Sequence, residues 1–159
     1  MVSKPHKSAE RKKSAPTGRV LTDAELVDRL TKAEAISGNV VAPAKAFEKP
    51  SLGLSLGLTL ADRLAGIAIE AVLPDGSAST VLAFSTALGL GARLLTECGD
   101  AKRVLVVTDV VDGKASLMES LGRVPADALA GVGCLVELAG AGQVAEGLGV
   151  PFVSLVRAD

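Results

Sequence analysis

The chain is poor in aromatic residues and carries no excess charge of either sign. Its 159 residues include no tryptophan, no tyrosine and only three phenylalanines. A nucleic-acid platform that stacks bases on aromatic rings is therefore not expected. The formal net charge of -1 does not indicate a nucleic acid or a membrane surface as partner of the whole chain. No apolar run approaches the roughly 20 residues that a membrane-spanning helix needs, so no membrane span is expected.

Residues that bind metals or form disulfides are equally scarce. The two cysteines, Cys98 and Cys134, lack the spacing of a metal site. Cys134 lies in an apolar segment and is expected to be a small core residue. The single histidine, His6, lies in a polar tail and is not expected to be catalytic. The sequence thus predicts no metal site and, for an intracellular protein, no disulfide.

Residues 1–20 form a basic tail whose composition differs from the rest. The tail carries six lysines and arginines against a single acid, Glu10. A segment with so little to bury does not fold on its own. Two interpretations stay open: a solvated tail, or a basic arm that contacts protein subunits of a larger complex or RNA. Because the tail has no secretory apolar region, we expect an intracellular protein, cytoplasmic or organellar (mitochondrial included), and not a secreted one.

Residues 21–159 read as one α/β domain. A capping box of Thr22 and Glu25 predicts the start of a helix that ends near Gly38. An extended link is expected over 40–50, and Gly53 and Gly57 predict a closely packed helix over 52–64. Helices are then expected at 78–90, 115–122 and 141–148, and strands at 66–73, 92–96, 103–108, 131–138 and 152–156. This alternation predicts a mostly parallel sheet flanked by helices, a Rossmann-like architecture.

The segment Arg103–Ser116 carries the most specific pattern in the chain. Val104 to Val107 form an unbroken apolar run, typical of a strand buried on both faces. Asp109 follows at the end of that strand, then a loop, then a helical pattern. Right-handed crossovers place the carboxyl ends of strands 66–73 and 103–108 at one edge of the sheet, where open α/β sheets bind ligands. We therefore expect any ligand site at this edge.

The same segment resembles the loop that binds phosphoribosyl diphosphate (PRPP) in the type I phosphoribosyltransferases, most closely the adenine-specific ones. In that family two acids hold the ribose hydroxyls, and a Thr-Gly-Gly-Thr turn holds the 5'-phosphate. The resemblance leaves Asp109, Gly113, Lys114 and Ser116 as the remnant ribose- and phosphate-binding residues. Thr108 replaces the first acid, and Asp112 places a negative charge near the phosphate. Lys114 would partly offset that charge.

The C-terminal third follows the resemblance more closely. Glu137-Leu138 and the run Ser154 to Arg157 stand where the family has a Glu-Leu pair and a Ser-Leu-hydrophobic-Arg strand. These positions are architectural and imply the fold. Upstream, Glu70-Ala71 match a Glu-Ala-Arg-Gly element, but Val72-Leu73 replace its diphosphate-binding Arg-Gly. Only Thr96 to Lys102, enough for a tight hairpin, stand where the family carries the hood that closes the site.

These replacements predict a catalytically inactive relative of adenine phosphoribosyltransferase that serves as a structural or interaction subunit of a larger intracellular assembly. Two alternatives remain: an active or weakly active purine phosphoribosyltransferase, and a binder of a phosphorylated nucleotide or sugar metabolite. No cofactor is expected, with Mg²⁺ and PRPP entering only under the alternatives. The resemblance also implies a homodimer, because members of the family commonly form one.

Overall fold

A computed structural model describes residues 17–158 of the chain. A five-stranded sheet forms its centre, and all four strand pairs are parallel. The strands are β3 (Ala71–Pro74), β4 (Arg93–Leu94), β5 (Val104–Asp112), β6 (Leu129–Leu138) and β7 (Phe152–Arg157), in the spatial order β4-β3-β5-β6-β7. The predicted α/β fold with a parallel sheet flanked by helices is confirmed. The strand order reverses between β3 and β5, the position at which doubly wound sheets hold ligands.

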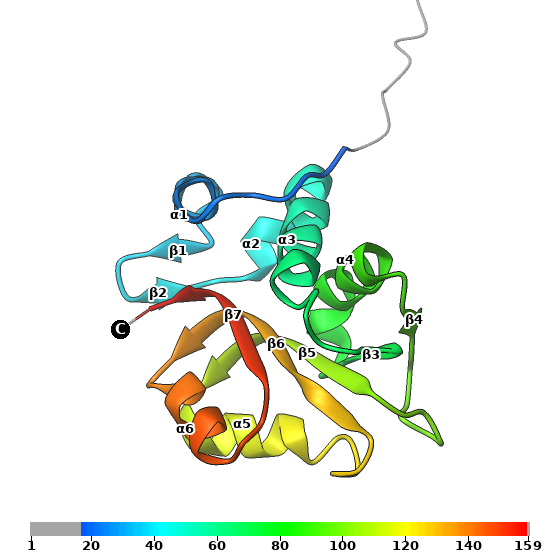
Figure 1. Cartoon of the computed structure of the whole chain (residues 1–159). Helices are drawn as coiled ribbons and strands as arrows, with labels where there is room; N and C mark the ends of the chain where they lie inside the picture. The colour runs from blue at the N-terminus through cyan, green and yellow to red at the C-terminus, as the bar shows by residue number, and fades with distance from the viewer. Residues whose placement is uncertain (1–16, 159) are drawn as a thin grey trace, which may run out of the picture.

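Helices cover both faces of the sheet (Figure 1). One layer holds α1 (Asp23–Lys32), α2 (Ala44–Phe47), α3 (Pro50–Arg63) and α4 (Thr80–Leu90), and the short 3-10 helix η1 (Ser77–Ser79) precedes α4. The opposite layer holds α5 (Gly113–Leu121) and α6 (Ala141–Gly147). Two apolar cores result, one on each face, because the sheet residues alternate between them. In the described part of the chain no helix is both long and apolar enough to cross a membrane.

The N-terminal part of the domain has the predicted capping box, but the segments that follow it differ from the sequence-based prediction. Thr22 and Glu25 cap α1 as predicted. The helix ends at Lys32, however, because Glu34 takes a left-handed conformation (φ 59°). Gly38 (φ 56°) instead turns a small antiparallel pair, β1 (Ile36–Ser37) with β2 (Val40–Val41). The extended link predicted over 40–50 is also wrong, since α2 lies within it.

Two strand predictions and one connection also need correction. Residues 66–70 precede β3 and are not strand, because the neighbouring strands pair with it only from Ala71 onward. β5 runs on to Asp112, because its residues from Val110 keep pairing with β6. The hairpin predicted over 96–102 does not form, since β3 separates β4 from β5 and the two run parallel.

The described start of the chain lies across α3. The backbone N–H of Arg19 donates to Ser55 Oγ at 3.1 Å, and that of Leu21 donates to Thr59 Oγ1 at 2.9 Å. The guanidinium of Arg19 pairs with Glu25 on α1. Residues 1–16, which hold most of the predicted basic tail and His6, lie outside the described residues. The partner predicted for that tail stays a prediction.

Candidate functional site

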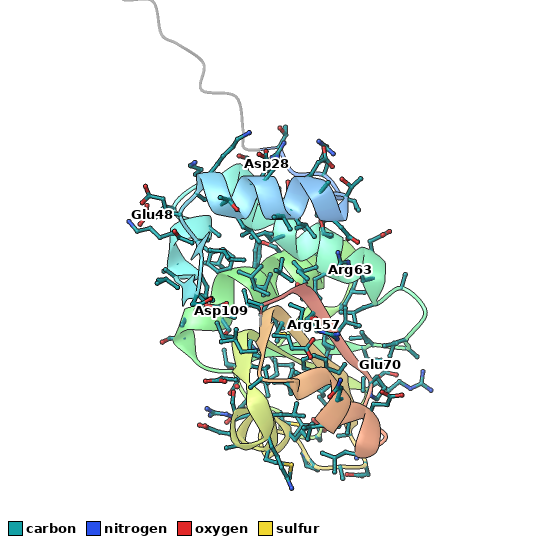
Figure 2. The ribbon with its side chains drawn as sticks, turned by 90° about the vertical axis from the view of Figure 1, so that its left-hand side faces the viewer. Asp28, Glu48, Arg63, Glu70, Asp109 and Arg157 are labelled. Carbon is teal, nitrogen blue, oxygen red and sulfur yellow. The ribbon has the colours of Figure 1, made fainter. Side chains whose placement is uncertain are left out.

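The carboxyl edge of β3 and β5 gathers the polar side chains predicted to form a site. Figure 2 shows Asp109 on the opposite side of the molecule from Glu70, which precedes β3. The edge therefore lies where the topology predicts it. The turn after β3 supplies Asp75, and β5 supplies Asp109 and Asp112. A cavity of about 330 Å³ opens beside the turn, between Ser77, Leu94 and Arg123.

Asp109 is a half-buried carboxylate with few polar neighbours. Its backbone N–H donates to Ser79 Oγ at 3.2 Å, but its Oδ1 is buried without a hydrogen-bond partner. Burial raises the pKa of this carboxyl to about 6. Thr108, before it, is 7% exposed and its hydroxyl donates weakly to the carbonyl of Val110 at 3.4 Å. Thr108, which replaces the first ribose-binding acid of the resemblance, is therefore buried.

The raised pKa makes stability depend on pH. The native state holds the Asp109 proton more tightly than the unfolded chain does, so this residue's contribution to stability is complete below about pH 4. It is lost as the pH rises to about 6. We expect the free energy of unfolding of Asp109→Asn, measured with urea, to exceed that of wild type by about 1–2 kcal/mol at pH 8, after allowance for partial exposure. At pH 4 the two proteins should have equal free energies of unfolding. Asp112→Asn, at an exposed position, is the control and should change stability by less than about 0.5 kcal/mol. Equal stability of Asp109→Asn and wild type at pH 8 would contradict the assignment.

The other predicted site residues lie at the start of α5. Gly113 has a φ of 69°, which suits glycine, and opens the helix directly after β5. The side chain of Asp112 makes no capping hydrogen bond. Lys114 is exposed and Ser116 is half-buried in the next turn. The structure thus brings Asp109 and the first turn of α5 to one edge. Whether they bind a ligand stays a prediction.

Asp75 was not among the predicted site residues, yet it is the most strongly bonded acid of this edge. Ser120 Oγ donates to its Oδ2 at 2.5 Å, and Arg123 Nε donates to its Oδ1 at 2.8 Å. Its side chain is 12% exposed. The Pro-Asp-Gly-Ser turn, Pro74–Ser77, was the signal that could have found it. The pairing also neutralises Arg123, the cation beside the cavity.

The residues that the resemblance sets at the diphosphate-binding Arg-Gly lie within β3. Val72 and Leu73 lie inside β3 and are 0% and 4% exposed, so neither can face a ligand. The turn Pro74–Ser77 occupies the carboxyl end of that strand instead, with Gly76 at φ 94°. Its side chains offer a carboxylate and a hydroxyl, not a guanidinium.

Glu137 is a buried acid at the carboxyl end of β6. Its side chain is 1% exposed and accepts hydrogen bonds from the Gly142 N–H (2.6 Å), Ser154 Oγ (2.9 Å) and Arg157 Nε (3.3 Å). All its oxygens are therefore engaged in joining β6, β7 and α6. This supports the architectural interpretation of the C-terminal match.

Comparisons with known proteins agree with the topology. No family model matches the sequence, and no curated protein does so either. Solved structures do match: UMP synthase from Leishmania donovani (TM-score 0.70, 15% identity, 86% of this chain and 36% of that one), orotate phosphoribosyltransferase from Aeropyrum pernix (0.64, 22%, 83% and 93%) and adenine phosphoribosyltransferase from Leishmania tarentolae (0.62, 16%, 93% and 94%). The chain has the phosphoribosyltransferase fold.

The resemblance seen in the sequence is thereby confirmed for the phosphoribosyltransferase fold. Orotate and adenine enzymes of this fold match about equally well, at TM-scores of 0.64 and 0.62, so the fold does not single out the adenine branch. The chain spans about a third of the UMP synthase but nearly all of the two smaller phosphoribosyltransferases. Among the described residues, no group of three or more His, Cys, Asp and Glu side chains could hold a metal ion.

Proposed function

We propose that this chain is a catalytically inactive protein of the phosphoribosyltransferase fold that serves as an interaction subunit of a larger intracellular assembly. The connection between β4 and β5 carries the proposal. In the family that the sequence resembles, this stretch is the hood that closes over the bound substrates. Here it is the nine residues Leu95–Arg103.

The connection is fastened away from the carboxyl edge. The carbonyl of Arg103 accepts the Glu70 N–H at 3.0 Å, on the amino-terminal side of β3. Lys102 Nζ pairs with Asp127 Oδ2 at 3.0 Å, just before β6. A segment this short, tied at its end to the opposite edge, cannot cover a substrate and exclude water.

The charges at the carboxyl edge also oppose the transfer reaction. Phosphoribosyl transfer depends on cations and donors positioned around a diphosphate and a developing positive charge. At this edge Asp75 and Arg123 pair with each other, which leaves two further acids, Asp109 and Asp112, beside the exposed Lys114. Asp109, with one oxygen buried, offers a Mg²⁺ ion little more than one carboxylate oxygen. We therefore propose that the chain works without a cofactor.

Two measurements test the proposal. Purified protein with PRPP, Mg²⁺ and either adenine or orotate should give no nucleotide above the blank. The untagged endogenous chain, fractionated by native size after gentle lysis, should elute in a complex much larger than twice its own 16.0 kDa. Turnover at an ordinary enzymatic rate would refute the inactive state, and elution only as a small free species would refute the assembly.

A second candidate function, binding of a phosphorylated metabolite, rests on Lys114. This lysine is exposed in the first turn of α5, and within residues 17–158 it forms no ion pair. The helix start beside it has no side-chain cap, so its N–H groups are free to bind an anion. If it binds, PRPP or AMP should raise the melting temperature of wild type but not of Lys114→Ala. Lys49→Ala, at an exposed position on the N-terminal side of α3, is the control. No shift in wild type would remove this candidate.

A further inference from the structure

Charge is divided unevenly along this nearly neutral chain. Residues 1–52 carry ten lysines and arginines against six acids, a net charge of +4. Residues 53–159 carry seven lysines and arginines against twelve acids, a net charge of -5. The overall charge of -1 is therefore the sum of a basic N-terminal third and an acidic remainder. Such an asymmetry is typical of a chain that contacts a polyanion through one of its parts.

The folded part of this basic third has two adjoining hollows lined with cations. The first, of about 360 Å³, lies between the described start of the chain, α1 and α3, and is lined by Arg19 and Arg29. The second, of about 190 Å³, is lined by Arg29, Lys32 and Lys49. Both include Ser51, and no acid is among the described residues that line them. These five residues form one continuous surface, called the cationic surface below.

Arg29 connects the two hollows and has its charge available. It is half-buried in the last turn of α1, and within residues 17–158 neither it nor Lys49 forms an ion pair. Arg19 and Lys32 pair with acids of α1 but are 57% and 71% exposed, so these pairs contribute little and compete weakly with another anion. A half-buried guanidinium without a counter-ion favours the approach of an external anion.

We propose that the cationic surface binds the phosphate backbone of a nucleic-acid duplex. Several cations on one surface suit a ligand that repeats its anion, because each contact releases counterions from the nucleic acid. The fork of an arginine matches the geometry of a phosphate. The hydroxyls of Thr17 and Ser51, which also line the hollows, are donors of the kind that contact backbone oxygens. No aromatic side chain lines either hollow, so stacking on unpaired bases contributes nothing and a duplex is favoured.

The apolar content of the surface favours a nucleic acid over an acidic polypeptide. Leu52 is the one large apolar side chain that lines the hollows, and it is 4% exposed. Protein partners are usually held by apolar and aromatic anchors at the centre of the interface. Interfaces with nucleic acids are polar and positively charged instead. The cationic surface has the second composition.

The basic tail joins the fold at this surface. Thr17, the first described residue, lines the first hollow. Residues 1–16, which precede it, add five lysines and arginines against one acid. Figure 1 shows the described chain entering past α3 and α1 on the side of these helices that faces away from the sheet. The cations of the tail are thus attached beside the folded cations, and both are available to one duplex.

This inference goes beyond the proposed function, because it names one class of partner and requires neither activity nor its loss. The cationic surface shares no residue with the carboxyl edge of β3 and β5. The turnover assay tests the inactive state, the native size tests the assembly, and the binding of a duplex tests only the present proposal. The proposals can therefore fail separately.

The first test measures binding of the purified full chain to duplexes of about 20 base pairs by fluorescence anisotropy. An RNA and a DNA duplex of the same sequence are used, and the tighter complex identifies the source of the phosphates. We expect a Kd of about 10 μM or tighter at about 50 mM salt. The logarithm of the association constant should fall with log salt at a slope of about -4, as contact with about five phosphates requires. A Kd weaker than about 100 μM for both duplexes would overturn the proposal.

The second test separates the folded surface from the tail and from overall charge, in the full chain. Arg29→Gln should weaken binding by about five-fold and make the salt slope shallower by about 1. Lys32→Gln should act in the same direction. Arg93→Gln removes the same charge from an exposed position on β4 and is the control, which should bind like wild type. If both surface variants bind like wild type, or if Arg93→Gln weakens binding as much as they do, the folded surface is not the site.

The third test is competition, which identifies the class of anion. Unlabelled duplex should displace the labelled one, whereas poly-glutamate at the same concentration of charge should displace it at least about ten-fold less well, since a carboxylate chain lacks the charge density of a duplex. AMP offers a single phosphate group and should not displace it at that concentration. Displacement by poly-glutamate equal to that by the duplex would assign the surface to an acidic polypeptide. Equal displacement by AMP would assign it to a small phosphate ligand, and either result would refute the duplex.

Discussion

Replacing Glu137 with leucine is expected to destabilise the domain by about 3 kcal/mol. The side chain is 1% exposed, and its removal leaves the Gly142 N–H and the Ser154 hydroxyl without their acceptors. Buried donors that lose their acceptor keep the full cost of desolvation. Urea unfolding followed by circular dichroism measures the change in free energy.

The matched variants separate charge from hydrogen bonding. Arg157→Gln removes the cation from a residue that is 63% exposed and should cost less than about 1 kcal/mol. Glu137→Gln keeps the shape of the side chain and one acceptor oxygen. Its cost in stability should therefore fall between those of Arg157→Gln and Glu137→Leu. If Arg157→Gln costs as much as Glu137→Leu, then the ion pair, and not the buried hydrogen bonds, joins β6 to β7.

Gly57→Ala is expected to cost about 2–3 kcal/mol, although alanine is the better helix former. A Cβ at residue 57 would lie 2.1 Å from Ser85 Cβ and 2.6 Å from the Ser85 carbonyl carbon. Backbone atoms cannot rotate away, so α3 and α4 must separate. The gain of about 1 kcal/mol in helix propensity offsets only part of this cost. Thermal and urea unfolding measure the result.

Gly147→Ala provides the control for the helix-propensity term. Gly147 also lies in a helix, but a Cβ there would meet nothing within 4 Å. This variant should be neutral or up to about 1 kcal/mol more stable than wild type. A Gly57→Ala variant that behaves like Gly147→Ala would show that α3 and α4 do not approach as closely as the structure has them.

The long, regular elements could be predicted from sequence because their signals are local. The glycines of 52–64 predicted a closely packed helix, and α3 does pack on α4 through Gly57. The helix begins two residues earlier than expected, at Pro50, where proline suits the first turn. β6 and β7 both follow the predicted apolar runs closely. For β6 the reason is that a strand buried on both faces has little freedom in composition.

The short strands could not be predicted, since their lengths are set by distant partners. Ile67 and Ile69 alternate like a strand but pack against the core from a loop, because the neighbouring strands begin only at the level of Ala71. Val110 and Val111 were expected in a loop, but they belong to β5 because β6 extends alongside them. Asp75 could not be predicted as a site residue for the same reason, because its partners Ser120 and Arg123 are 45 and 48 residues away in sequence.

The connection Leu95–Arg103 makes the domain a practical carrier for foreign sequence. Glu97, Gly99 and Asp100 are exposed at its tip, while both of its ends are held by strands that pair with β3. Loop tips of this kind accept insertions, since lengthening a loop adds little entropic cost. An epitope or a fluorescent reporter inserted after Gly99 would leave both ends of the chain free. Such a reporter would follow the protein inside the cell.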